Sequence, residues 1–247
     1  MLDSTISGLA TGTFLGLLGG GGSIIAVPIL VYLLGMEAKQ AIGTSLLIIG
    51  LASLLAGWSH FRNRNILLKP ALIFGATGTP GALAGARMAE LVPDSIQLAA
   101  FAVLLSVVAL FMLSKRPANL AFEETRKPSM TLLISLGWLA GVLTGFLGVG
   151  GGFIIVPALT LVLKVPIKKA IGTSLLIIAI NSLVGAISYS TTMTATPAIW
   201  SFALATLIAA PVSGALSQTV PQEKLRLSFA LVLLLLSAWM LSKQFLG

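Results

Sequence analysis

Long apolar segments, separated by short polar loops, follow one another along this chain of 247 residues. They cover residues 4–34, 41–59, 70–90, 95–114, 131–163, 170–190, 197–217 and 225–242. Six of them have about the 20 residues that a helix needs to cross the hydrocarbon core of a bilayer. Only 9% of the residues are charged, which is too few to cover a soluble domain of this size. We therefore expect an all-α integral membrane protein.

The charged residues carry a net charge of +8. In a soluble chain this excess would suggest nucleic acid as a partner, whereas in a membrane chain it marks cytoplasmic loops. We therefore expect the lipid bilayer as a partner, and no nucleic acid. The chain has no cysteine and one histidine, and its seven acids fall at helix ends or in loops. No metal site, cofactor or enzymatic nucleophile with its base is expected.

The same segment occurs twice in the chain. Residues 12–49 align without a gap with residues 141–178, and 21 of the 38 positions are identical. The nine residues 41–49 (Ala-Ile-Gly-Thr-Ser-Leu-Leu-Ile-Ile) recur unchanged 129 positions later. This repetition predicts two homologous membrane repeats, residues 1–114 and 129–247. The stretch 115–128 has six charged residues and two prolines, which is typical of a linker.

The first apolar segment of each repeat is too long for one crossing and is interrupted by glycine. The glycines are Gly19–Gly22 in the first repeat, and Gly148 with Gly150–Gly152 in the second. Each glycine inside a helix costs about 1 kcal/mol relative to alanine, so we expect the helix to break there. The segment then either crosses the membrane or returns as a re-entrant hairpin of two short helices.

The positions of Lys and Arg favour the re-entrant hairpin. If the broken segments cross, the two sides of the membrane hold 8 and 7 of these residues. If the segments are re-entrant, the sides hold 12 and 3, which is a strong positive-inside bias. We therefore predict two inverted repeats, each a Gly-broken re-entrant helical hairpin plus three transmembrane helices. The linker would be cytoplasmic, with both termini outside.

Inverted repeats with discontinuous helices are the architecture of many secondary transporters. The second arm of each hairpin begins just after its glycines, so its free N–H groups would face the membrane centre and could bind an anion. The alternative is that the glycines only allow helices to pack closely. The residues predicted to bind substrate here are Gly20, Gly21, Gly22, Ser23, Gly150, Gly151 and Gly152.

Polar side chains inside the spans form a second candidate group. Thr44 and Ser45 recur as Thr173 and Ser174, and their hydroxyls could donate to an oxyanion or coordinate a cation. The alternative is that each bonds to its own helix. Asn181 could contact substrate or make an interhelical hydrogen bond. His60 is expected at the membrane interface rather than in a proton relay.

The Gly-rich stretch Leu18–Gly22 with Pro28, its copy Leu147–Gly152 with Pro157, and the twin Ala-Ile-Gly-Thr-Ser-Leu runs resemble the TauE/SafE sulfite exporter family. This family is also called the 4-toluene sulfonate uptake permeases. The resemblance covers essentially the whole chain. It implies a multi-pass carrier of the cell inner membrane for a small sulfur oxyanion, either sulfite or an organosulfonate such as sulfoacetate. The two glycine loops differ, because Val149 stands where the first repeat has Gly20.

Two directions of transport remain open at this point. An interior-negative membrane potential drives anions outward, by about 2.3 kcal/mol per charge per 100 mV, so we expect export by alternating access. The alternative is a cation-coupled importer of sulfur anions or sulfonates, in which Thr44, Ser45, Thr173 and Ser174 help to hold Na⁺. A third alternative is an anion channel, or a membrane scaffold that transports nothing. A homodimer is compatible with the sequence.

Overall fold

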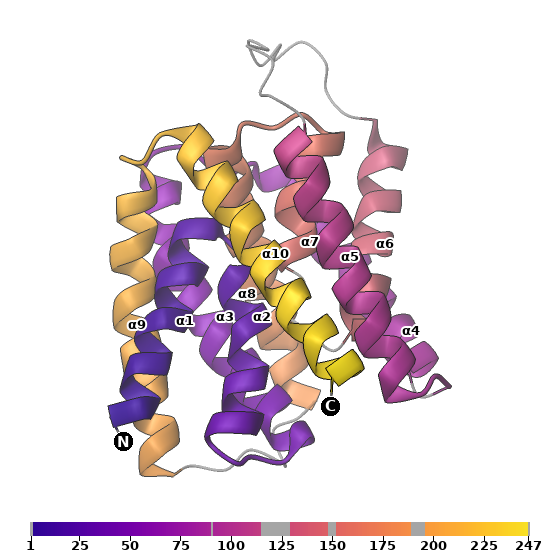
Figure 1. Ribbon diagram of the computed structural model, residues 1–247. Helices are drawn as coiled ribbons and strands as arrows, with labels where there is room; N and C mark the ends of the chain where they lie inside the picture. The colour runs from indigo at the N-terminus through magenta and orange to yellow at the C-terminus, as the bar shows by residue number, and fades with distance from the viewer. Residues whose placement is uncertain (1, 90, 115–128, 148–151, 189–195, 247) are drawn as a thin grey trace.

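The computed structural model describes residues 2–89, 91–114, 129–147, 152–188 and 196–246, and this part of the chain is helical apart from short connections (Figure 1). The helices of the N-terminal half are α1 (Leu2–Leu18), α2 (Gly21–Pro28), α3 (Ala38–Arg62), α4 (Leu68–Ala89) and α5 (Asp94–Ser114). Those of the C-terminal half are α6 (Met130–Leu147), α7 (Gly152–Pro157), α8 (Ile167–Ser188), α9 (Pro197–Ser217) and α10 (Gln222–Leu246).

The first apolar segment breaks at its glycines, as the sequence predicts. α1 ends at Leu18, α2 begins at Gly21, and the two helices pack against each other. Both short second arms, α2 and α7, end at a proline and continue as a turn of π-helix, η1 (Ile29–Leu33) and η2 (Ala158–Val162). Single turns of π-helix inside α-helices occur frequently at functional sites.

Three helices are long and apolar enough to cross a membrane by length and composition, within the described residues. They cover Gln40–Arg62, Ile167–Ile187 and Pro197–Ser217. Shorter apolar helices cover Gly21–Leu33, Ala99–Ser114 and Met130–Phe146. The sequence led us to expect six full spans. α4 has 22 residues, but the glycines, threonines and proline in its middle and the cations near both its ends make it less apolar.

Helices α3 and α8, which carry the two copies of the duplicated nine-residue run, pack against each other and run antiparallel. Gly50 lies against Leu183, and Gly57 lies against Leu175. Residues with lower numbers on α3 therefore face residues with higher numbers on α8. This register fixes the relative level of every polar residue on the two helices.

Two further helix pairs meet along glycines. α1 contacts α9 through Gly8, Gly12 and Gly16, and α6 contacts α4 through Gly137, Gly141 and Gly145. Each set is spaced by four residues and so lies on one face of its helix, and the second set follows the first by 129 residues. A methyl group at most of these positions would meet a backbone carbonyl of the facing helix. Glycine therefore lets these backbones approach closely.

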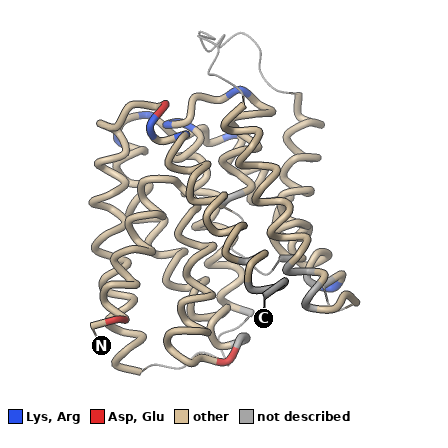
Figure 2. Tube along the Cα trace, in the orientation of Figure 1, with Lys and Arg blue, Asp and Glu red and all other residues tan. Residues whose placement is uncertain are grey.

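The two ends of the bundle differ in charge. The start of α1 and the end of α10 lie at one end, and the end of α5 and the start of α6 lie at the other, which we call the linker end (Figure 1). Lys and Arg gather at the linker end (Figure 2). In the described residues the linker end holds eight of them: Arg62, Arg64, Lys69, Lys164, Lys168, Lys169, Lys224 and Arg226. At the opposite end the structure describes the side chain of one of them, Arg87.

Candidate functional site

The starts of α2 and α7 meet inside the bundle. Gly20, which precedes α2, and Gly152, the first residue of α7, pack backbone to backbone. A Cβ added to Gly152 would lie 2.5 Å from the Gly20 Cα, and one added to Gly20 would lie 2.7 Å from the Gly152 Cα. Ile178, halfway along α8, also lies against Gly152. Only glycine fits at these two positions without moving one short helix away from the other.

The turn between α1 and α2 is anchored on α8. Gly19 has a φ of +68°, which glycine adopts without strain. The Ser174 Oγ lies 2.6 Å from the Gly19 carbonyl oxygen and 2.8 Å from the Ile171 carbonyl oxygen of its own helix. Ser174 is completely buried. Because a hydroxyl has one proton, Ser174 donates to one of these two carbonyls at a time.

Two glycines that we predicted to bind an anion have different surroundings. A Cβ on Gly22 would lie 2.5 Å from the Thr11 carbonyl oxygen, so this glycine lets α2 pack on α1. A Cβ on Gly21 would have more room, with its nearest neighbour, the Leu18 Cδ1, 3.3 Å away. Close packing, the alternative to an anion site, therefore explains Gly22 but not Gly21.

The remaining predicted residues of the two hairpins divide between described and undescribed parts of the chain. Ser23 is buried, and its Oγ donates to the Gly20 carbonyl oxygen at 2.9 Å. Gly150 and Gly151 lie outside the described residues. In the second hairpin the structure therefore describes the first arm, α6, up to Leu147 and the second arm from Gly152 onward.

The two Gly-Thr-Ser segments lie at different levels of the bundle. With Gly50 of α3 opposite Leu183 of α8, Ser45 and Ser174 are roughly 20 Å apart along the helix axes, at 1.5 Å per residue. The structure brings Ser174 to the hairpin turn at Gly19, but it does not bring Ser45 and Ser174 together. One small anion in this conformation cannot contact both serines.

Most of these hydroxyls also have partners in their own helix. Ser45 donates to the Ile42 carbonyl at 2.9 Å, and Thr173 donates to the Lys169 carbonyl at 2.6 Å. Thr173 also accepts the Leu67 backbone N–H at 3.0 Å. The Thr44 hydroxyl is buried without a hydrogen-bond partner within the described part of the chain. Back-bonding, the alternative that we weighed for these side chains, therefore describes Ser45 and Thr173 but not Thr44.

Asn181 lines a small cavity between α4, α6, α7 and α8. The other lining residues are Phe74, Gly78, Gly137, Ala140, Gly141, Thr144, Ile155 and Ile177. The volume open to the centre of a water molecule is about 10 Å³, enough for about one water and too small for an oxyanion. The Thr79 hydroxyl lies 3.3 Å from the Asn181 Oδ1. Asn181 therefore makes the interhelical contact that we considered as an alternative to substrate binding.

His60 lies in a polar cluster that the sequence did not reveal. We expected it at the membrane interface, but its side chain is completely buried. Its Nε2 lies 3.1 Å from the Ser217 Oγ, and the Gln218 Nε2 lies 2.7 Å from its Nδ1. Asn65 donates to the Gln218 Oε1 at 2.7 Å, and Lys168 donates to the Gln218 carbonyl. This cluster joins α3, α8 and α9 at the linker end.

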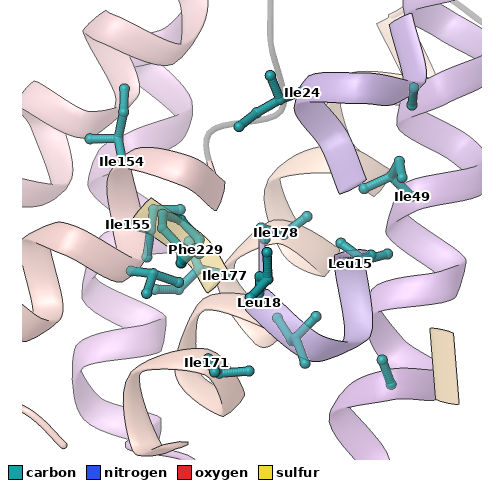
Figure 3. Close-up of a cluster of buried hydrophobic side chains, with 14 of the residues drawn as sticks. Leu15, Leu18, Ile24, Ile49, Ile154, Ile155, Ile171, Ile177, Ile178 and Phe229 are labelled. Carbon is teal, nitrogen blue, oxygen red and sulfur yellow. The ribbon is translucent and has the colours of Figure 1, made fainter. Parts of the chain in front are cut away.

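Apolar side chains surround the contact between the two short helices. Figure 3 shows side chains from α1, α2, α3, α7, α8 and α10 gathered there: Leu15, Leu18, Ile24, Ile49, Ile154, Ile155, Ile171, Ile177, Ile178 and Phe229. The described Lys and Arg residues lie towards the two ends of the bundle instead (Figure 2). A charged substrate at this level would therefore be met by backbone N–H groups and hydroxyls rather than by cationic side chains.

Comparison with known proteins identifies the family. The sequence profile of the family described as "Sulfite exporter TauE/SafE" matches residues 4–240. A Xylella fastidiosa (strain Temecula1) protein named "Probable membrane transporter protein" is 36% identical over 188 residues, which are 74% of this chain and 72% of the relative. "Probable membrane transporter protein YunE" of Bacillus subtilis is 30% identical over 241 residues, 88% and 87% of the two chains. No solved structure gives a significant match.

These matches extend over nearly the whole chain, and they agree with its apolar helices and with the paucity of charge in the middle of the bundle. The relatives carry the names of membrane transporters, not of enzymes. The chain is therefore a multi-pass membrane protein that belongs to the TauE/SafE sulfite exporter family, a family of transporters.

Proposed function

We propose that this protein is an inner-membrane secondary transporter that exports a small sulfur-containing oxyanion by alternating access. The substrate would be sulfite or an organosulfonate such as sulfoacetate, in keeping with the name of the family. The observation that carries the proposal is the backbone contact between Gly20 and Gly152, where two short helices begin inside the bundle. Discontinuous helices with exposed N–H groups are how many secondary transporters hold anionic substrates.

The architecture proposed with this function is a pair of inverted repeats, residues 1–114 and 129–247, joined by a cytoplasmic linker, residues 115–128. Two patterns support it. The α1–α9 contact has its counterpart in the α6–α4 contact, so the first helix of each half packs on the other half. The homologous helices α3 and α8 run antiparallel, as inversion requires. Each broken segment would then be a re-entrant hairpin.

The charge distribution supports the orientation. Eight described Lys and Arg residues lie at the linker end, and of those at the opposite end the side chain of Arg87 is described. Cytoplasmic loops of membrane proteins carry this excess. The linker end would therefore face the cytoplasm, and the site would be loaded from that side during export.

In this proposal the anion contacts different residues at successive levels of the bundle, rather than all of them at a single site. The amides at Gly20, Gly21, Gly22 and Ser23, with those at Gly150, Gly151 and Gly152, would bind it where the short helices begin. Thr173 and Ser174 would meet it on the linker side of this point, and Thr44 and Ser45 on the opposite side, since the α3–α8 register places them at separate levels. Asn181 lies beside the route in its small cavity.

Flux of labelled sulfite in proteoliposomes tests the proposal, with the membrane potential and the Na⁺ gradient varied independently. We expect flux that follows the potential outward, by about 2.3 kcal/mol per charge per 100 mV, and that does not respond to Na⁺. Unlabelled sulfite should compete far better than chloride, because each of its oxygens can accept a separate N–H or O–H donor. Flux that requires a Na⁺ gradient would support the importer instead, and equal competition by chloride would contradict an oxyanion site.

A further inference from the structure

We infer that Ser53 and Ser182 are a pair of hydroxyl donors that binds the transported oxyanion at the centre of the bundle. The inference rests on the proposed function and adds a binding pair to its site. Ser53 lies on α3 and Ser182 on α8, again 129 residues apart. They come shortly after the two copies of the duplicated run, and so they occupy matching places in the two halves.

Both serines are buried and unpaired. Ser53 is 0% exposed and Ser182 is 1% exposed, and neither Oγ has a hydrogen-bond partner among the residues that the structure describes. Burying a hydroxyl without a partner costs free energy. Other buried serines in this protein avoid that cost by donating to a carbonyl of their own helix, as Ser217 and Ser237 do at 2.7 and 2.9 Å. The usual helical role of a membrane serine therefore does not account for Ser53 and Ser182.

The two unpaired hydroxyls lie at the same level. With Gly50 opposite Leu183, Ser53 and Ser182 are only roughly 3 Å apart along the helix axes, at 1.5 Å per residue. Ser45 and Ser174, by the same register, are roughly 20 Å apart. The pair Ser53 and Ser182 is therefore close enough in level to meet one small anion, whereas the pair in the duplicated run is not.

The face of α8 that bears Ser182 is turned towards the two hairpins. Ser174, Ile178 and Ser182 are spaced by four residues and therefore share one face of the helix. Ser174 contacts Gly19 of the first hairpin, and Ile178 contacts Gly152 of the second. On α3, Ile49 stands four residues before Ser53 and belongs to the same central cluster as Ile178 (Figure 3). The serine pair thus lies on the helix faces that border the start of the short helices.

The chemistry suits an oxyanion. Two hydroxyls at one level can each donate to a different oxygen of a pyramidal or tetrahedral anion such as sulfite. Both hydroxyls are buried, so a donor there is worth more than one exposed to water. A serine pair of this kind contributes selectivity for oxygen acceptors without placing a full positive charge in the bundle.

The test measures the half-saturating sulfite concentration and the thermal unfolding midpoint of the full chain in parallel. Ser53→Ala and Ser182→Ala should each raise the half-saturating concentration about 5- to 30-fold, by similar factors because the positions match. Their unfolding midpoints should not fall, since no hydrogen bond within the protein is lost. Ser53→Thr and Ser182→Thr keep the donor and should recover part of the affinity. Ser237→Ala, which removes a buried but internally bonded hydroxyl of α10, is the control and should leave the half-saturating concentration unchanged.

Three results would overturn the inference. If the Ser53→Ala/Ser182→Ala double variant has the half-saturating sulfite concentration of the wild type, both serines lie outside the binding site, and the proposed function still stands. Lower unfolding midpoints with unchanged affinity would assign the hydroxyls to the protein's own structure. Wild-type protein that carries neither sulfite nor an organosulfonate would remove the proposed function and this inference together.

Discussion

The Ser174 hydroxyl lies 2.6 Å from the carbonyl oxygen of Gly19 and so ties α8 to the turn of the first hairpin. Among the residues that the structure describes, its counterpart Ser45 donates to the Ile42 carbonyl of its own helix. The same residue in the same repeated run thus makes a contact between the halves in one copy and a local contact in the other. Identical sequence does not imply an identical role here, because each copy faces a different partner.

This difference gives the first prediction. Ser174→Ala should lower the free energy of unfolding by about 1–2 kcal/mol, because a buried carbonyl loses its donor. Ser45→Ala should change it by less than about 0.5 kcal/mol, because only a local hydrogen bond is removed. Thermal or denaturant unfolding of the purified protein checks both values. Equal effects of the two substitutions would contradict the anchoring role of Ser174.

Sidedness gives the second prediction, and the chain is well suited to test it because it contains no cysteine. Arg87 stands at the end of α4, and Thr219 follows the end of α9, the counterpart of α4; both side chains are exposed. If the repeats are inverted, Arg87→Cys should react with a membrane-impermeant maleimide in intact cells. Thr219→Cys should react only after permeabilisation. Labelling of both from the same side would rule out inverted repeats.

The His60 cluster gives the third prediction. Its geometry is satisfied by a neutral imidazole that accepts from Gln218 at Nδ1 and donates from Nε2 to Ser217. His60→Ala should lower the free energy of unfolding by about 2–4 kcal/mol, because it opens a cavity and leaves Gln218 and Ser217 with fewer partners. The neighbouring Ser59→Ala removes only a bond to the Ala56 carbonyl and serves as the control. A loss no larger for His60→Ala than for this control would contradict the cluster's stabilising role.

Much of the fold could be predicted from the sequence because its signals are local or periodic. The apolar segments predicted helices, the glycines predicted the break between Leu18 and Gly21, and the positions of Lys and Arg predicted the charge difference between the two ends. The packing role of Gly22 was weighed only as an alternative, because the sequence does not tell which atoms a glycine faces.

The parts that could not be predicted depend on distant partners. His60 is joined to Ser217, 157 residues away, and nothing in its local sequence indicates burial. The level difference between Ser45 and Ser174 follows only from the antiparallel register of α3 and α8. Ser53 and Ser182 could have been found by extending the 129-residue comparison beyond the identical run, but their lack of partners could not.

The proposed transport function depends most on the contact between Gly20 and Gly152, and the addition of a single methyl group tests it. In proteoliposomes, Gly20→Ala should reduce sulfite flux by about tenfold or more, because the added carbon overlaps the Gly152 backbone and pushes the short helices apart. Gly57→Ala adds the same group on α3, where the nearest atom is 3.8 Å away, and should retain flux. Both proteins should insert into membranes in wild-type amounts. Wild-type sulfite flux in Gly20→Ala would contradict the claim that transport depends on these two helix starts.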